Sequence, residues 1–383
     1  MPSNKNSINI LLAPNTFKNS LPANEVAAAL AEGLKQSGID ATINCCPVGD
    51  GGDGTGKILA LHLNAQKRVY KTVDPLGRPI TAPVYYTSDH TAIIELSDAS
   101  GLKLLQPIEY DPLQANTYGT GILIKKALDR KVKRILLAIG GSATVDGGTG
   151  SLNALGIQFL NREGIKIKRL PLNLGQLQDI VLSGMDARLQ QTELIILCDV
   201  KNKLLGPNGA AKVFGPQKGA TPANISTLEK SLKRLDRIID QAWGIKISSL
   251  LHSGAAGGIA ASMAALCNAK MVNGTDFFLD IIQFNDQLQY ADIVITGEGS
   301  LDAQTLEGKA PLGVAQRAKS AGLKVIGVGG RLDPDNKKLL AYFDHLININ
   351  PATTGLAKAI TNTRANLVKT GSKIGALIKA NAV

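Results

Sequence analysis

The chain has 383 residues, a length that favours two domains over a single hydrophobic core. Its 44% hydrophobic and 19% charged residues are typical of a soluble globular protein, and no apolar stretch approaches the roughly 20 residues of a membrane span. The net charge of +11 allows an anionic partner, but no basic cluster is interleaved with aromatic residues, which disfavours a platform for single-stranded nucleic acid.

The cysteines indicate a reducing compartment. Cys45, Cys46, Cys198 and Cys267 form no CxxC motif, and the adjacent pair would make an awkward disulfide. The apolar run Ile8–Ala13 is too short for the core of a signal peptide. We therefore expect a cytoplasmic protein with neither a membrane nor a nucleic-acid partner. The sequence leaves the oligomeric state open, a homo-oligomer included.

Several short apolar runs end abruptly in Gly, Asp or Pro. They are rich in Ile, Val and Leu without polar alternation, which is typical of strands buried on both faces. In chain order these runs are Ile8–Ala13, Ile135–Ile139, Leu194–Cys198, Ile293–Thr296 and Lys324–Val328. Helical periodicity lies between them, over Asn24–Gln36, Gly119–Arg130 and Leu312–Ala321. The alternation predicts a parallel α/β sheet, whose ligands gather at the carboxyl ends of the strands.

The region that follows residue 68 has a different pattern. Short runs at Val69–Thr72, Thr81–Tyr86 and Ala92–Leu96 surround the turn Pro75–Gly77, which predicts antiparallel ribbons. We interpret this region as the start of a second α/β domain inserted into a Rossmann-like one. The expected boundaries are 1–68 with 284–383 for the Rossmann-like domain and 69–283 for the insertion. The active site is expected in the cleft between the two.

The first glycine-rich turn runs from Gly49 to Lys57. It is one residue short of a P-loop and has Ile58 where Ser or Thr should bind Mg²⁺. Two carboxylates inside the turn would also repel phosphates. We expect Asp50 and Asp53 to hold a metal ion or a substrate hydroxyl, although they could equally cap a helix that starts near Thr55.

A second glycine-rich turn, Gly140–Gly150, directly follows a predicted strand. Small residues before a helix can present backbone N–H groups to an anion. The sequence is not GxGxxG, which disfavours a dinucleotide site. The residues expected to cradle phosphate or substrate are Gly140, Gly141, Ser142, Ala143 and Thr144. Asp146, the single carboxylate of the turn, is a candidate metal ligand.

Three further segments could contribute residues to the active site. Asp199 ends a strand, where a carboxylate can accept a hydroxyl proton or position Mg²⁺. Lys218 lies in a rigid turn suited to a phosphate or carboxylate. Gly257 and Gly258 precede a helix and could bind an anion, but close helix packing explains them equally well.

The last candidates surround the predicted strand Ile293–Thr296. Glu298 and Asp302 follow it and are candidate metal ligands. Lys18, just after the first strand, could neutralise phosphate charge. The four histidines show no metal-ligand spacing, and neither GxSxG nor HExxH occurs, which disfavours zinc and hydrolase chemistry. Carboxylates and anion-binding turns at one sheet edge suit Mg²⁺-assisted phosphoryl transfer, which depends on positioning and charge neutralisation.

These segments together resemble the glycerate kinase type I family over nearly the whole chain. The motifs that carry the resemblance are Ala13–Leu21, Val48–Thr55, Asp111–Leu113, Gly119–Gly121, Gly140–Gly148, Cys198–Val200, Phe214–Ala220, Gly254–Gly258 and Thr296–Lys309. The resemblance implies a kinase for D-glycerate that uses ATP and Mg²⁺ and has a Rossmann-like domain interrupted by a second α/β domain. The product it implies is 2-phosphoglycerate more often than 3-phosphoglycerate.

The chain departs from the family pattern at several positions. Asn15 removes a carboxylate, Val145 removes a polar group, Ser300 replaces a common Arg, and His252-Ser253 stand where Gly-Ala is frequent. We take Asp199 as general base or metal-positioning carboxylate and Lys18 as charge neutraliser. The alternatives are another small hydroxy-acid acceptor, a metabolite-binding member with weakened catalysis, and, from charge alone, a nucleic-acid binder.

Overall fold

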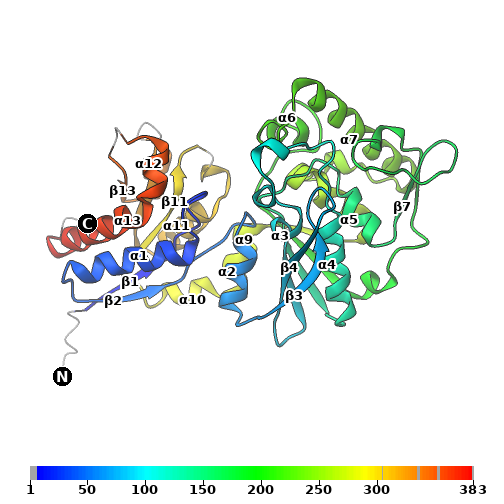
Figure 1. The fold of residues 1–383 in the computed structure, drawn as a ribbon. Helices are drawn as coiled ribbons and strands as arrows, with labels where there is room; N and C mark the ends of the chain where they lie inside the picture. Colours follow the sequence, from blue (N-terminus) through cyan, green and yellow to red (C-terminus); the bar gives the residue numbers. More distant parts are fainter. Residues whose placement is uncertain (1–6, 304, 334–336, 352–353, 382–383) are drawn as a thin grey trace. The chain divides into compact units, whose positions relative to one another are not determined.

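The computed structural model describes residues 7–303, 305–333, 337–351 and 354–381 (Figure 1). The chain forms two compact units, residues 1–50 with 275–383 and residues 51–274. The boundaries expected at 68/69 and 283/284 differ from these. Helix α2 (Thr55–His62) packs against β5 (Thr91–Glu95) of the second unit, and α9 (Gly274–Ile281) bonds to the first through Thr275 Oγ1 and Gly308 O, 2.8 Å apart. The chain therefore enters the second unit before α2 and returns to the first unit at the start of α9.

The sheet of the first unit has five parallel strands in the order β13-β12-β11-β1-β2. Their bounds are β1 Ile8–Leu12, β2 Ala41–Cys45, β11 Ile293–Leu301, β12 Lys324–Leu332 and β13 His345–Asn348. The chain adds β2 on one side of β1 and later strands on the other, so the strand order reverses between β1 and β11. Ligands of open α/β sheets bind outside the carboxyl ends at such a reversal. The predicted Rossmann-like parallel sheet is confirmed.

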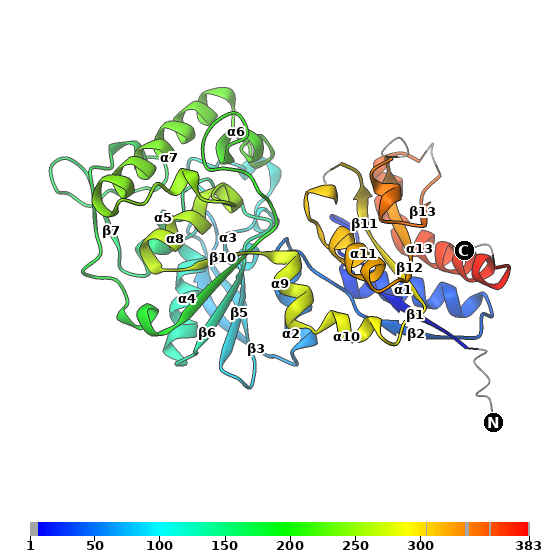
Figure 2. The same ribbon diagram turned by 180° about the vertical axis from the view of Figure 1, so that it is seen from behind.

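Helices cover both faces of this sheet (Figures 1 and 2). Helix α1 (Ala23–Gln36) pairs with α13 (Thr363–Lys379) on one face, whereas α10 (Phe284–Leu288) and α11 (Ala310–Ser320) lie on the other. The short helix α12 (Leu356–Thr361) precedes α13. Helices α1 and α13 pack closely at Gly33, where a Cβ atom would lie only 1.9 Å from Val368 O. The absence of a side chain at Gly33 allows this approach. This packing buries the apolar face of α1 against the strands.

The sheet of the second unit has six strands in the order β10-β9-β6-β5-β4-β3. The remaining bounds are β3 Gln66–Val73, β4 Pro79–Tyr86, β6 Arg134–Ala138, β9 Glu193–Cys198 and β10 Lys270–Asn273. Strands β5, β6, β9 and β10 are parallel, and β3 and β4 form the antiparallel edge. The antiparallel ribbons predicted here are confirmed. The parallel strands send their carboxyl ends to one edge.

The helices of the second unit pack around this sheet. They are α3 Ser97–Ser100, α4 Tyr118–Asp129, α5 Thr149–Ala154, α6 Ala210–Phe214, α7 Pro222–Trp243 and α8 Ile259–Cys267, with a small ladder of β7 (Gln158–Leu160) and β8 (Asp179–Val181). The ends of α7 follow from local sequence: Thr221 Oγ1 accepts the backbone N–H of Asn224, Pro222 occupies the first turn, and Gly244 ends the helix at φ 67°.

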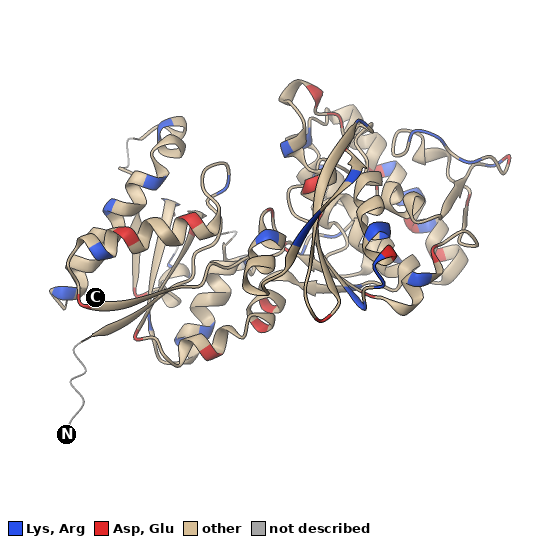
Figure 3. Cartoon of the chain, turned by 60° about the horizontal axis from the view of Figure 1, so that its bottom comes forward, with Lys and Arg blue, Asp and Glu red and all other residues tan. Residues whose placement is uncertain are grey.

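The positive charge is spread over both units and interspersed with acidic residues (Figure 3). In the basic segment 125–134, Lys126 pairs with Asp129 at 3.7 Å and Arg134 with Glu193 at 2.8 Å. Arg188 also reaches Asp129 at 2.9 Å. These pairs compensate part of the positive charge of the segment. Across the described residues, none of the helices combines the length and apolar composition that a membrane crossing requires.

Candidate active site

The first candidate group lies at the carboxyl edge of the first unit, where the strand order reverses. Asn15 follows β1, and its backbone N–H donates to Gly297 O of β11 at 2.8 Å. Its side-chain Nδ2 donates to Asp50 Oδ2 at 2.9 Å, and both side chains are buried. A neutral amide beside Asp50 avoids the repulsion that a second carboxylate would cause. The departure at Asn15 therefore gives Asp50 a hydrogen-bond donor in place of a second acid.

Glu298 lies on β11 at the same edge and is buried. Thr305 Oγ1 donates to Glu298 Oε1 at 2.9 Å, and Lys309 Nζ lies 3.9 Å from Oε2. Burial raises the pKa of Glu298 to about 7, against the charges of Lys309 and Lys18, and Asp50 adds to the rise. The charges of Asp50, Lys18 and Lys309 thus all act on Glu298. A divalent cation or a proton would relieve the repulsion between the acids.

The other two predicted residues of the first unit differ in surroundings. Lys18 is exposed, and its charge reaches Glu298. Asp302 accepts a hydrogen bond from Ser300 Oγ at 2.8 Å, and its backbone N–H donates to Thr305 Oγ1 at 3.1 Å. These bonds organise the turn after β11. Asp50, Glu298 and Asp302 therefore remain the candidate metal ligands of this unit.

In the second unit, the turn after Asp50 and the turn after β6 interlock. Gly140 N donates to Gly51 O at 3.0 Å, and a Cβ on Gly140 would lie 2.3 Å from Gly52 Cα. Gly54, at φ 90°, precedes α2, and the turn joins β2 of the first unit to this helix of the second. These glycines serve the close approach of two backbones, and they fix the orientation of Gly140 and Gly141.

An acid–base cluster that the sequence did not predict lies beside these turns. Ser97 Oγ donates to Asp53 Oδ1 at 2.6 Å and to Glu95 Oε1 at 3.0 Å, and Lys103 Nζ lies 2.7 Å from Asp98 Oδ1. Burial and the hydrogen bond to Asp53 raise the pKa of Glu95 to about 8. Burial also opposes ionisation of Asp53, but the bond to Glu95 and the charge of Lys103 lower its pKa overall. The only sequence signal was a glutamate that ends an apolar strand.

Asp146 is completely buried within its own turn. Its Oδ1 accepts Gly148 N at 3.0 Å, and its Oδ2 accepts Thr117 N at 2.9 Å, Thr117 Oγ1 at 2.7 Å and Gly150 N at 3.1 Å. Burial raises its pKa, and these donors oppose the rise. Both oxygens accept hydrogen bonds within the protein, and the metal-ligand role predicted for Asp146 stays a prediction. It braces the turn, together with Thr117, a residue that sequence reasoning missed.

Lys218 also braces this turn, and the phosphate- or carboxylate-binding role predicted for it stays a prediction. Its buried Nζ donates to Ser142 Oγ and to Thr144 O, each at 2.7 Å. Burial lowers the pKa of Lys218 to about 7, against the charges of Asp146 and Asp199. A neutral amine has two N–H donors, which match the two acceptors of Lys218, whereas the charged ammonium would bury a third donor. This match agrees with the lowered pKa.

Gly257 and Gly258 pack closely against neighbouring residues, and the role in anion binding predicted for them stays a prediction. Gly257 O accepts Gly147 N at 2.9 Å, and a Cβ on Gly257 would lie 2.2 Å from Thr144 O. A Cβ on Gly258 would lie 2.7 Å from Leu204 Cδ1. Only glycine allows this approach to the Gly140–Gly150 turn. Asp199 follows β9 at the same edge, half-buried, and its charge reaches Lys218.

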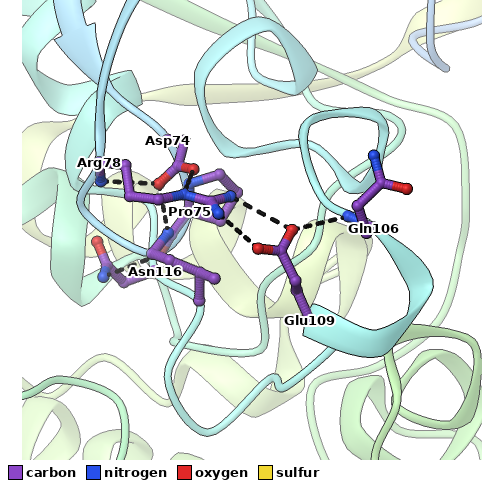
Figure 4. A network of polar contacts seen from close by, with 7 residues as sticks. Asp74, Pro75, Arg78, Gln106, Glu109 and Asn116 are labelled. Atoms are coloured by element: carbon purple, nitrogen blue, oxygen red, sulfur yellow. Dashed lines mark hydrogen bonds and ion pairs between the residues drawn. The ribbon is translucent and has the colours of Figure 1, made fainter.

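A polar network on the antiparallel side joins Asp74, Arg78, Glu109 and Asn116 (Figure 4). Arg78 bonds Asp74 Oδ2 and Glu109 Oε1, each at 2.5 Å, and Asp74 Oδ1 accepts the N–H of Arg78 at 2.9 Å. The turn so fixed presents Pro75 O to the backbone N–H of Asn116 at 2.9 Å. Since Thr117 comes next in the chain, the network positions the donors that hold Asp146.

Across the described residues, three or more His, Cys, Asp or Glu side chains nowhere group in a way that could hold a metal ion. Phosphate-bound Mg²⁺ needs fewer protein ligands, because one or two carboxylates and the phosphates of the substrate suffice. Asp50 and Glu298 fit that requirement, as two buried carboxylates that repel each other.

Comparison with known proteins covers nearly the whole chain. The family model described as "Glycerate kinase family" matches residues 10–379. A Bacillus subtilis protein named glycerate kinase is 39% identical over 97% of both chains. An Escherichia coli protein named glycerate 2-kinase is 38% identical over 85% of this chain and 86% of its own. A solved structure titled "Crystal structure of putative glycerate kinase 2 from Salmonella typhimurium LT2" matches with a TM-score of 0.82 and 37% identity. The match covers 98% of this chain and 100% of that chain.

Proposed function

The chain belongs to the glycerate kinase family, and from this premise we propose that it transfers the γ-phosphoryl group of ATP to D-glycerate, with release of ADP. The observation that carries the proposal is the extent of the family match, which includes both compact units. The 2-hydroxyl is the proposed acceptor, since one relative is named a glycerate 2-kinase. The four free cysteines suit a reducing cytoplasm, which we propose as the location.

The first unit is proposed to bind the phosphates of ATP. Lys18 and Lys309 supply positive charge beside Glu298, at the strand-order reversal where ligands of such sheets bind. Asp50 and Glu298 would hold Mg²⁺, which when bound to the nucleotide would offset phosphate charge. The chain's own residues keep this pair of acids buried and oriented through Asn15 and Thr305.

The second unit is proposed to bind the acceptor. Its edge carries three acidic residues, Asp53, Glu95 and Asp199. Carboxylates accept hydrogen bonds from the hydroxyl groups of a substrate, whereas they repel phosphate groups. The braced backbone from Gly140 to Thr144 would orient the substrate. Asp199 remains the proposed base, because it ends β9 on the same edge as that backbone. That groups of both units act on one pair of substrates stays a prediction.

The test is an assay of ADP release by the purified protein with ATP, Mg²⁺ and one acceptor at a time. D-glycerate should give the highest kcat/KM among glycerate, glycolate, lactate and tartronate. An NMR spectrum of the product should show 2-phosphoglycerate. Tight glycerate binding without ADP release would instead identify a metabolite-binding protein, and a higher kcat/KM with another acid would refute glycerate as the acceptor.

Asp199→Asn tests the base directly. A positioned base contributes roughly 10²–10⁴-fold to a rate, so we expect a loss of kcat in that range with an unchanged thermal midpoint. The exposed Asp240→Asn of α7 serves as the matched control and should keep the parental kcat. Near-normal turnover of Asp199→Asn would remove this residue from the mechanism.

A further inference from the structure

The turn from His252 to Gly258 holds an unusual series of left-handed residues. His252 has φ 63° and Ala256 has φ 46°, and Gly257 and Gly258 continue at 73° and 99°. Histidine pays a steric cost in this region that glycine avoids. His252 is nevertheless 95% removed from solvent, at 5% relative exposure. A strained, buried polar residue persists only where its surroundings over-determine it.

The turn is joined to the segment that begins with Asp199. His252 Nδ1 lies 2.6 Å from Val200 O, Gly254 N donates to Asn202 O at 2.9 Å, and Leu204 N donates to Ser253 Oγ at 2.9 Å. A backbone carbonyl can only accept, so His252 Nδ1 carries the hydrogen and donates it. The histidine therefore bonds the residue next to Asp199, and it does so with one defined ring nitrogen.

The opposite end of the turn is joined to the Gly140–Gly150 turn. Gly257 O accepts Gly147 N at 2.9 Å, and Thr144 O lies too close to Gly257 for any side chain. Residues 252–258 thus connect the Asp199 segment to the backbone that Lys218 braces. Glycine at position 252 would adopt this positive φ at a lower steric cost. The hydrogen bond of the imidazole to Val200 O therefore explains why a histidine occupies the position.

We propose that His252 is a positioning residue for Asp199, which holds the Val200 carbonyl and thereby sets the place of the Asp199 carboxylate against the Gly140–Gly150 turn. The inference rests on the proposed function through the role of Asp199 alone. Displacement of a reacting group by about 1 Å can cost roughly 100-fold in rate. Loss of the Nδ1 hydrogen bond should therefore lower kcat and leave the KM for ATP unchanged.

The test compares substitutions that differ in which ring nitrogen they imitate. Asn carries its amide nitrogen at the distance of Nδ1 and tolerates positive φ, whereas the longer Gln imitates Nε2. We expect His252→Asn to keep kcat within about threefold and His252→Gln and His252→Gly to lose roughly 10- to 100-fold. His90 is the matched control: it has the same φ of 63° but is exposed, so His90→Gln should be as active as the parent.

A measurement without substrate separates this proposal from the proposed function. In a ¹⁵N-histidine NMR spectrum at neutral pH, the His252 signals, assigned by their loss in His252→Asn, should show a protonated Nδ1. If the parent phosphorylates none of the acids, the proposed function fails, and a protonated Nδ1 would still support the hydrogen bond that holds Val200. Parental kcat in His252→Gln, equal losses in His252→Asn and His252→Gln, or an unprotonated Nδ1 would each overturn the proposal.

Discussion

The two units use buried acids at their sheet edges in opposite ways. Asp146 of the second unit accepts four hydrogen bonds from Thr117, Gly148 and Gly150. Glu298 of the first unit has one short bond from Thr305 and a lysine at 3.9 Å. Both are buried acids within glycine-rich sequence at the carboxyl edge of a sheet, Asp146 after β6 and Glu298 on β11 itself. The difference is the extent to which the protein itself satisfies the carboxylate.

This comparison separates positioning from chemistry. An acid whose two oxygens accept several hydrogen bonds, most of them from backbone N–H groups, holds a turn together, and its removal leaves those donors unsatisfied. An acid that is buried with fewer donors keeps a perturbed pKa and the capacity to interact with a ligand. We therefore expect stability effects from the first kind and activity effects from the second.

Asp146→Ala should give the largest effect. It leaves the N–H groups of Thr117, Gly148 and Gly150 without their acceptor inside the protein, so the free energy of unfolding should fall by about 3–5 kcal/mol. Urea denaturation followed by circular dichroism measures the change. Asp302→Ala, in a more exposed turn of the first unit, should cost far less. Equal losses for the two variants would contradict the distinction between the two kinds of acid.

Glu298→Gln should have the next largest effect, and on activity. The amide keeps an acceptor for Thr305 but removes the charge beside Asp50, so we expect kcat to fall roughly 10²–10³-fold. The Mg²⁺ concentration needed for half-maximal rate should rise, and the thermal midpoint should change little. Steady-state kinetics over a Mg²⁺ series measures both quantities. The exposed Glu25→Gln of α1 is the control, and a Glu298→Gln enzyme as active as that control would assign Glu298 to structure.

Lys18→Ala should have a smaller effect. Lys18 is exposed and acts through charge, so its loss should lower kcat/KM for ATP roughly tenfold, with less loss at high ionic strength because salt already screens the lysine. Lys35→Ala, at an exposed position in the last turn of α1, is the matched control. Unchanged KM and kcat in Lys18→Ala would show that this lysine does not neutralise phosphate.

Lys218→Met should alter the pH dependence of stability. The pKa of Lys218 is about 7 when folded and ordinarily 10.5, so the folded protein binds fewer protons than the unfolded chain between these values. Relative to Lys218→Met, the parent should gain stability as pH rises through that window, by up to about 1.4 kcal/mol per pH unit, and show no such gain below pH 7. Urea midpoints from pH 6 to 10 measure this difference. The exposed Lys212→Met should reproduce the parental curve, and a parental curve for Lys218→Met would contradict the depressed pKa.

The fold was predictable where burial is complete. The apolar runs at Ile8–Ala13, Ile135–Ile139 and Leu194–Cys198 became β1, β6 and β9 within a residue or so at each end. Strands β2 and β13 escaped prediction, because they lie at sheet edges and mix exposed polar residues with apolar ones. Edge strands lack the continuous hydrophobic pattern from which the interior strands were identified.

The sequence by itself determined the family, the parallel α/β class, and the position of glycine-rich and acidic turns at strand ends, since these depend on local pattern. Only the tertiary structure decided which acids are satisfied. Asp146 and Glu298 look alike along the chain, but the donors that distinguish them come from Thr117, 29 residues before Asp146, and from Thr305 in the turn after β11. The same holds for Glu95, Lys218 and His252, whose partners lie elsewhere in the sequence. A hydrogen bond is set by distance in space, and spacing along a chain does not specify that distance.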